Sequence, residues 1–261
     1  MSVNRQVLLS FDIEEFDVPA EYGIDIPFDR QISISVTGTL RILDLLKGSG
    51  IKATFFSTVV FAKSAQHVID RIIAEGHELA SHGWFHSSFE NKDLITSKNE
   101  LARISGVEVK GFRMARMMNV DDTAIKDAGY FYNSSLNPIY LPGRYNNFGS
   151  KRTVFKEHGL VHLPASATPL LRIPLFWLSF HHLPFWLYKM ACQRTINNDD
   201  YLNIYFHPWE FADISDPQLG LPWLIRKNSG EEMVTRFREL LLWMQRKHYT
   251  FGRLIDFAER Q

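Results

Sequence analysis

Short apolar runs alternate along this chain with longer segments in which apolar residues recur at helical spacing. The first three predicted strands are Val7–Phe11, Ala53–Ser57 and Glu78–Ser81, and residues 39–46 and 64–75 between them have the period of helices. Strands that alternate with helices are typical of βαβ units, because two parallel strands need a crossover connection between them. We therefore expect an α/β fold with a mostly parallel sheet.

The rest of the chain continues this pattern. Further strands are predicted at residues 111–113, 130–132 and 203–206, and an amphipathic helix follows at 231–247. The length of 261 residues suits a single α/β barrel. Since no internal repeat, low-complexity tract or linker-like change of composition interrupts the pattern, we predict one domain over residues 1–261.

Composition excludes several classes of partner. Lys and Arg balance Asp and Glu at 29 each, so no net field attracts nucleic acid. No apolar run has the length of about 18 charge-free residues that predicts a membrane-spanning helix. Cys192 is the single cysteine, which excludes an internal disulfide framework and fits a reducing compartment. Residues 1–6 pass into a short apolar run that ends at the charged group Asp12 to Asp17 and is too short for a signal peptide, so we expect a cytoplasmic protein.

Polar side chains stand where the predicted strands end. Asp12, His82, Arg113, Asn133 and His207 each lie at or just beyond the carboxyl end of a predicted strand. The carboxyl ends of parallel strands meet on one face of an α/β sheet or barrel, where catalytic groups converge. These positions favour one shared site.

A pair of histidines near the third predicted strand has the spacing of metal ligands. His82 and His86 are four residues apart, which brings two imidazoles within reach of one cation, although an isolated pair could also be solvated or capping. Two histidines and one carboxylate form a catalytic zinc set with an open position for water. The carboxylates that could complete it, unless they form a solvated acidic loop, are Asp12, Glu14, Glu15 and Asp17.

The strand-end residues also suggest separate roles in metal binding and proton transfer. Side chains alternate along a strand, so Asp12 and Glu14 should point the same way, one to bind a metal and the other to take a proton. His207 ends an apolar strand, where it suits proton transfer near neutral pH, although a structural core histidine would also fit. Arg113 would pair with the acidic cluster and hold Asp12 ionised, unless it is an ordinary surface arginine.

Two longer motifs make the chain resemble a known family. Residues 50–56 (GIKATFF) and 76–86 (GHELASHGWFH), in this order and spacing, closely resemble the NodB-homology polysaccharide deacetylases, carbohydrate esterase family four. Ser10-Phe11-Asp12 looks like the opening of the family's first motif, Gly111-Phe112-Arg113 like its third and Phe206-His207-Pro208 like its last. The resemblance spans about residues 7–210.

The resemblance implies a distorted (β/α) barrel of about seven strands that forms a single polysaccharide deacetylase-like catalytic domain. It also implies hydrolysis of N-acetyl groups on sugars, with a divalent metal held by one aspartate and two histidines. By position, Asp12 would be the general base, Arg113 its partner, His82 and His86 metal ligands, and His207 the general acid. Zinc is the expected metal, with cobalt and nickel as alternatives. The metal would polarise the acetyl carbonyl and a water that Asp12 deprotonates.

The first motif departs from the family at the carboxylate ligand. Ile13 follows Asp12 where the family has a second aspartate. Glu14 is therefore the predicted ligand, because some branches of the family have Asp-x-Asp or Asp-x-Glu at this place. Glu15 and Asp17 are the alternatives.

Two later motifs also depart from the family. Arg113 is followed by Met114-Ala115-Arg116 instead of a proline and an aromatic residue, and the aspartate that tunes the catalytic histidine is missing, with Glu210 as a possible substitute. We expect Arg116 and Trp209 to contact the substrate. The Asp-x-Glu opening and the His-Pro-Trp-Glu string that begins at His207 resemble one branch of the family, found in bacterial glycan-biosynthesis loci and near allantoinase-like members.

An apolar, aromatic insertion is expected at about residues 165–200, and residues 168–192 within it are unusually rich in Leu, Phe and Trp. A helix that covers the barrel would explain this composition. The sharper interpretation is an apolar lid that receives a lipid-linked sugar at the inner membrane surface.

The predicted reaction is the release of acetate from an N-acetylated sugar of a glycan or, since no export signal is apparent, of a glycan precursor. One alternative is a metal-independent, allantoinase-like amidohydrolase that acts on a small cyclic ureide. The other is a catalytically inactive, sugar-binding barrel. The sequence predicts no oligomeric state.

Overall fold

The computed structural model describes residues 5–261, and its main sheet has the strand order β10-β1-β2-β3-β4-β5-β9-β8, with β11 paired to β1. Every neighbouring pair in it is parallel except the hairpin β8–β9. The predicted distorted barrel is therefore confirmed, since the seven strands from β10 to β9 form a parallel arc. The strands are β1 (Gln6–Ile13), β2 (Thr54–Ser57), β3 (Glu78–Ser81), β4 (Gly111–Phe112), β5 (Tyr132–Asn133), β8 (Phe155–Glu157), β9 (Leu160–His162), β10 (Tyr201–Phe206) and β11 (Thr250–Gly252).

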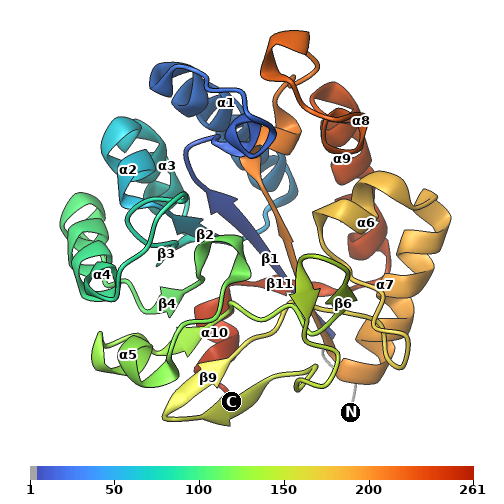
Figure 1. The fold of residues 1–261 in the computed structure, drawn as a ribbon. Coiled ribbons are helices and arrows are strands. Elements are labelled where there is room, and N and C mark those ends of the chain that lie inside the picture. The colour runs from blue at the N-terminus through green and yellow to red at the C-terminus, as the bar shows by residue number, and fades with distance from the viewer. Residues whose placement is uncertain (1–4) are drawn as a thin grey trace.

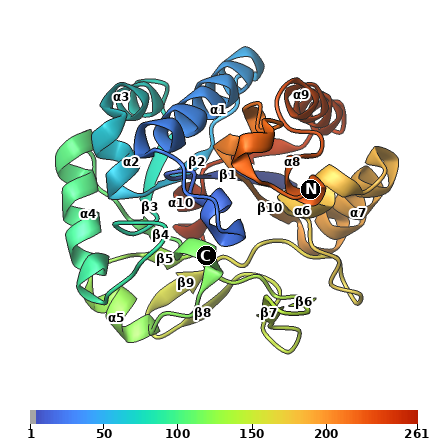
Figure 2. The same cartoon turned by 45° about the horizontal axis from the view of Figure 1, so that its top comes forward.

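Helices surround the outer side of the curled sheet, as Figure 1 and Figure 2 show. The larger ones are α1 (Phe28–Ser49), α3 (Gln66–Ala74), α4 (Lys92–Ser105), α7 (Phe185–Asp199) and α9 (Glu231–Arg246). Shorter elements join them: α2 (Val59–Ser64), α5 (Asp122–Asp127), α6 (Trp177–His182), α8 (Trp223–Arg226), α10 (Leu254–Ala258), the 3-10 turns η1 (Val18–Tyr22), η2 (Ala115–Met117), η3 (Pro208–Phe211) and η4 (Pro217–Leu219), and the small hairpin β6 (Tyr140–Leu141) with β7 (Tyr145–Asn146). Across the described part of the chain, none of these helices has the length and apolarity needed to cross a bilayer.

The helix expected over residues 64–75 is wrong in its start. The chain forms two helices there, and Ser64 is the last residue of α2, not the first residue of the next helix. Thr58 caps α2, because its hydroxyl oxygen accepts a hydrogen bond from the backbone N–H of Phe61 at 3.1 Å. The helix expected over 39–46 is also longer, since α1 begins at Phe28.

The side chains of β1 alternate between two environments, as predicted. Phe11 and Ile13 belong to the large core between the sheet and the helices, while Leu8 belongs to the smaller core inside the barrel. Asp12 and Glu14 have the same parity as Leu8, and both line a cavity inside the sheet. The strand thus places two carboxylates at one mouth of the barrel.

Helix α10 closes the opposite end of the barrel. Leu254 packs inside with Leu8, and the strand residues Thr54 and Glu78 accept hydrogen bonds from the backbone N–H groups of Leu254 and Ile255. Burial raises the pKa of the Glu78 carboxyl to about 6, against the lowering effect of its hydrogen bonds. With this end filled, a cavity is left at the carboxyl ends of the strands.

The sheet closes through a loop instead of a strand pair between β9 and β10. Ser166, which follows β9, donates its backbone N–H to the carbonyl of Asn203 at 2.8 Å, and the Asn203 N–H returns a bond of 2.8 Å to the Ser166 hydroxyl. Residues after this junction form α6 and α7, which pack against β10. The predicted insertion therefore lies beside the strand that ends at His207.

Candidate active site

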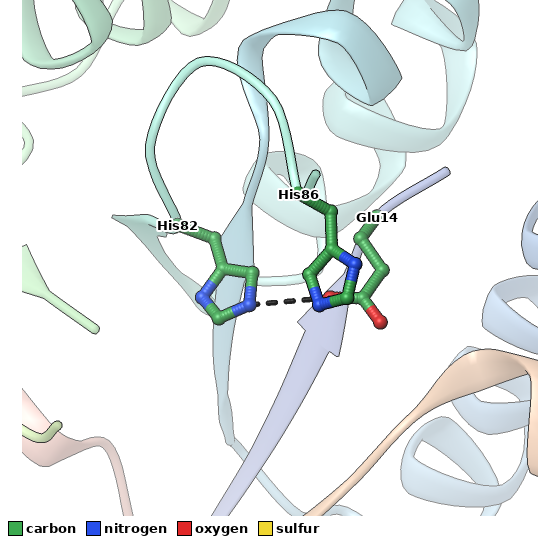
Figure 3. Close-up of side chains that lie close together, drawn as sticks. All are labelled: Glu14, His82 and His86. Carbon is green, nitrogen blue, oxygen red and sulfur yellow. Dashed lines mark ion pairs between the residues drawn. The ribbon is translucent and has the colours of Figure 1, made fainter. Parts of the chain in front are cut away.

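Three side chains from two strand ends meet at the mouth of the barrel. One carboxylate oxygen of Glu14, Oε2, lies 3.2 Å from Nε2 of His82 and 3.2 Å from Nε2 of His86. Figure 3 shows the two imidazole rings on the loop after β3, with the Glu14 carboxylate beside them. All three residues are buried, and their ligand atoms lie within 4.8 Å of one another, so one ion could contact all three.

Hydrogen bonds on the far side of each ring fix how the two histidines face Glu14. Nδ1 of His82 lies 2.9 Å from the carbonyl oxygen of Arg113, which can only accept, so this nitrogen carries a proton. Nδ1 of His86 lies 2.7 Å from a carboxylate oxygen of Asp17. Both rings therefore have the Nε2 nitrogen free for a ligand bond, and the Asp17–His86 pair is the arrangement found behind many metal-bound histidines.

The charges of this cluster fit a cation. Oε2 of Glu14 is buried and has no hydrogen-bond donor within the described chain, which would be costly unless something positive lies beside it. Burial lowers the pKa of His86, but the carboxylates of Glu14 and Asp17 outweigh burial and raise this pKa to about 9. The same negative charges that attract a proton would attract a divalent ion, and one oxygen with two imidazole nitrogens suits zinc.

The other two carboxylates considered as ligands have different partners. Glu15 accepts hydrogen bonds from the Thr58 hydroxyl at 2.9 Å and from the backbone N–H of His86 at 2.8 Å. Burial raises the pKa of Glu15 despite these bonds. Asp17 lies behind His86, so Glu14 is the carboxylate whose oxygen stands between the two histidines.

Asp12 and Arg113 form a buried ion pair beside this cluster. The Arg113 guanidinium donates to Oδ1 of Asp12 at 2.6 Å and to the Ser134 backbone and hydroxyl at 3.2 and 3.0 Å. Burial alone would raise the pKa of Asp12, but Arg113, with help from His82 and His207, holds it below its ordinary value. Asp12 is therefore a carboxylate kept ionised at the edge of the cavity.

His207 follows β10 and faces the same cavity. Its Nδ1 lies 3.1 Å from Oε1 of Glu210, and the same oxygen accepts the His207 backbone N–H at 2.5 Å. Burial lowers the pKa of His207, but Glu210, Glu14 and Asp12 raise it above its ordinary value. The ring is stacked on Trp209 at 5.1 Å between centroids, with Trp177 edge-on at 5.8 Å.

A cavity of about 220 Å³ connects these groups. Asp12, Glu14, His82, His86 and His207 line its polar side. The remaining wall comes mainly from loops and from residues at the start of α6, and includes Val18, Tyr22, Arg116, Met117, Arg144, Phe176, Trp177, Leu178, Tyr205 and Trp209.

Of the predicted positions Arg116 and Asn133, the first reaches the cavity and the second does not. Arg116 lines the cavity and has a left-handed backbone with φ of 56°, an uncommon conformation that often marks functional loops. Its guanidinium lies 3.4 Å from both Asp17 and Glu21. Asn133 is not part of the lining; its side chain accepts hydrogen bonds from Ser135 in the turn after β5.

The structure also brings in residues that the sequence motifs do not single out. Phe176 and Tyr205 form part of the cavity wall, and His181 of α6 lies against Glu210. Asp17 was considered only as a ligand, whereas it bonds to the back of His86. A histidine within an apolar, aromatic segment was the one available signal for His181.

The family comparison agrees with this arrangement. Residues 6–130 match the family model described as polysaccharide deacetylase, a segment that runs from β1 to α5 and contains Asp12, Glu14, His82, His86 and Arg113. This match covers slightly less than half of the 261 residues, and over it the chain is similar to the polysaccharide deacetylase family. The resemblance drawn from the motifs is confirmed.

Individual relatives are distant. An uncharacterised 30.6 kDa protein of Geobacillus stearothermophilus is 32% identical over 87 residues, which make up 33% of this chain and 32% of that protein. The match thus spans about a third of that relative's length. A structure described as a polysaccharide deacetylase from Mycobacterium smegmatis has a TM-score of 0.69 at 16% identity, covering 98% of this chain and 90% of the other. Puue allantoinase has a TM-score of 0.68 at 14% identity, with 99% and 90% covered, and both likenesses concern the fold alone.

Proposed function

We propose that this protein is a deacetylase that depends on a divalent metal and hydrolyses the N-acetyl group of a sugar to release acetate and a free amine. The observation that carries the proposal is the position of the Glu14 carboxylate oxygen, 3.2 Å from Nε2 of both His82 and His86 and without any other donor in the described chain. These residues would hold the ion, and zinc is the ion that their donor atoms suit best, with cobalt and nickel as alternatives.

The residues around the cluster divide the chemistry between them. When bound, the cation would supply Lewis acidity toward the acetyl carbonyl and a water molecule. Asp12 would take a proton from that attacking water, because Arg113 keeps its carboxylate ionised. His207 would give a proton to the departing nitrogen, because Glu210 favours its protonated form. The products are acetate and the amine of the sugar.

The cavity suggests how a sugar would be held. Trp209 stacks on His207 and could present an apolar surface to a sugar ring, and Arg116 at the cavity wall could bind its polar groups. We propose an N-acetylated glycan or glycan precursor as the substrate. A soluble substrate and a lipid-linked substrate predict different behaviour of the protein toward membranes.

Metal analysis and an acetate-release assay test the proposal together. We expect about one divalent ion per chain after zinc supplementation, and its loss in Glu14→Ala, His82→Ala and His86→Ala. His67→Ala, an exposed histidine on α3, is the matched control that should retain the ion. A wild-type protein that binds no zinc, cobalt or nickel would refute metal dependence.

Two other functions make different predictions. An allantoinase-like amidohydrolase would hydrolyse a small cyclic ureide without added metal. The fold likeness to Puue allantoinase is the observation that favours this alternative. A catalytically inactive, sugar-binding barrel would bind N-acetylated sugars and release no acetate. Turnover of each substrate class, with and without chelator, separates all three.

The lipid-linked version of the substrate has its own support and its own test. Leu170 and Leu171, in the loop before α6, are 79% and 76% exposed, and Trp186 at the start of α7 is 65% exposed. Trp177, by contrast, lies inside the cavity wall beside His207. Liposome flotation should recover the wild type and lose Leu170→Ser/Leu171→Ser; no flotation of the wild type would reject the lipid-linked substrate at a membrane surface.

A further inference from the structure

A buried chain of hydrogen bonds continues behind His207. The second carboxylate oxygen of Glu210, Oε2, lies 2.9 Å from Nε2 of His181, and Nδ1 of the same ring lies 2.8 Å from the carbonyl oxygen of Lys227. The side chains of His181 and Glu210 are both fully buried. Three segments distant in sequence, α6, the turn after β10 and the loop after α8, thus meet in one line of polar groups.

The partners of this chain determine where its protons lie. The Lys227 carbonyl can only accept, so Nδ1 of His181 must carry a proton. Nε2 of His181 then either donates to an ionised Glu210 or accepts from a protonated one. Oε1 of Glu210 already accepts the backbone N–H of His207 and faces Nδ1 of that ring, so this carboxylate acts as an acceptor, and Nε2 of His181 is placed to donate to its other oxygen. The ring of His181 is therefore a donor at both nitrogens.

We propose that His181 is a positioning residue for His207: by donating to Oε2 of Glu210, it orients that carboxylate, so that Oε1 fixes the ring of His207 with Nε2 toward the cavity. The inference rests on the proposed function for the role of His207 as the proton donor. His181 does not line the cavity and acts through Glu210, without contact to the substrate.

The surroundings explain why Glu210 needs a second donor. A carboxylate taken out of water is stable only when its oxygens are bonded or paired, and Glu210 is fully buried. Without His181, Oε2 would be left buried and unpaired, and the carboxylate would lose the contact that orients it toward His207. Asn228 holds the backbone of His181 by donating to its carbonyl at 2.7 Å, and the ring of Trp177 packs edge-on against the His181 ring at 6.0 Å between centroids.

Two amide substitutions separate the role of each ring nitrogen. In His181→Gln, the amide nitrogen can occupy the place of Nε2 and still donate to Glu210, whereas in the shorter His181→Asn it can reach only the place of Nδ1. We expect kcat to fall about 10- to 100-fold in His181→Asn with KM unchanged, and about fivefold or less in His181→Gln. His182→Asn is the matched control, because its ring bonds to the Leu224 carbonyl instead. Equal losses in both His181 variants, or a loss confined to KM, would overturn the proposal.

Two further measurements keep the proposal testable if a substitution at His181 disturbs folding. In wild-type protein labelled with ¹⁵N-histidine, both nitrogens of His181 should be protonated at the pH of the assay, and an unprotonated Nε2 would overturn the proposal without any variant. In a Glu210→Gln background, His181→Asn should add little further loss, because the two residues act in series; additive losses would contradict this. A wild type that releases no acetate from any tested sugar refutes the proposed function, while the NMR result still decides on the hydrogen-bond chain.

Discussion

Nδ1 of His86 lies 2.7 Å from the carboxylate of Asp17, on the side of the ring that faces away from Glu14. This bond orients the imidazole and leaves Nε2, 3.2 Å from Glu14, as the nitrogen available to an ion. Asp17 thereby increases the basicity of a ligand without contacting the ion itself.

Replacing Asp17 tests this arrangement. We expect Asp17→Asn to raise the Kd for zinc about 10- to 100-fold, because the amide keeps the shape of the side chain and loses its charge. Isothermal titration with zinc measures the change. Asp25→Asn, at an exposed position on the loop after η1, should bind zinc as the wild type does. Equal affinities in wild type and Asp17→Asn would show that this bond does not support the site.

Asp12 on β1 and Glu14 just after its end point to the same side, but their proposed roles differ. Asp12→Asn should keep the metal and lose about 10²- to 10⁴-fold in kcat, since the amide cannot take a proton from water. Metal analysis together with acetate release from an N-acetylated sugar gives both quantities on one sample. Substantial activity in Asp12→Asn would remove Asp12 from the role of base, and loss of the ion would make it a ligand.

The pH dependence of the activity follows from the directions of two pKa shifts, those of Asp12 and His207. Asp12 must be ionised to act as base, so activity is lost as the pH falls through its pKa, which Arg113 lowers against the effect of burial. His207 must be protonated to act as acid, so activity is lost as the pH rises through its pKa, which Glu210 raises against the effect of burial. We expect a profile of kcat/KM that is broad around neutral pH.

Glu210→Gln is the variant that tests the alkaline limb of this profile. A bound cation lowers the pKa of both groups, but it is common to wild type and variant, so their difference reports on Glu210. The alkaline limb should move to lower pH in Glu210→Gln, and the acid limb should stay where it is. An alkaline limb that does not move would assign it to another group.

The parts of the site that depend on strand topology could be predicted from the sequence. Parallel strands bring their carboxyl ends together wherever the loops run, so Asp12, His82 and His207 line one cavity and Arg113 pairs with Asp12 beside it. Alternation along β1 likewise placed Glu14 beside Asp12. Asn133 has the same strand-end position, but its short side chain bonds within its own turn, which the strand pattern does not predict.

The parts that depend on loop paths could not be predicted in this way. His181 and Glu210 are 29 residues apart and meet because α6 packs beside the turn that follows β10. Asp17 reaches His86 only because the chain turns back after β1. The early part of α1 was missed for another reason, since its β-branched residues, such as Ile34 and Val36, weaken the helical signal.

Gly38 of α1 lies against the residue that follows His207, and its substitution should disturb both stability and activity. A Cβ atom at Gly38 would lie 1.8 Å from the carbonyl oxygen of Pro208, so either the helix or the turn must move. We expect Gly38→Ala to lower the free energy of unfolding by about 1–3 kcal/mol and to reduce kcat through a displaced His207. Gly48→Ala, in the same helix with nothing within 4 Å, should leave stability unchanged or raise it by up to about 1 kcal/mol. Urea unfolding and acetate release, measured on both variants, would contradict this packing if the two behaved alike.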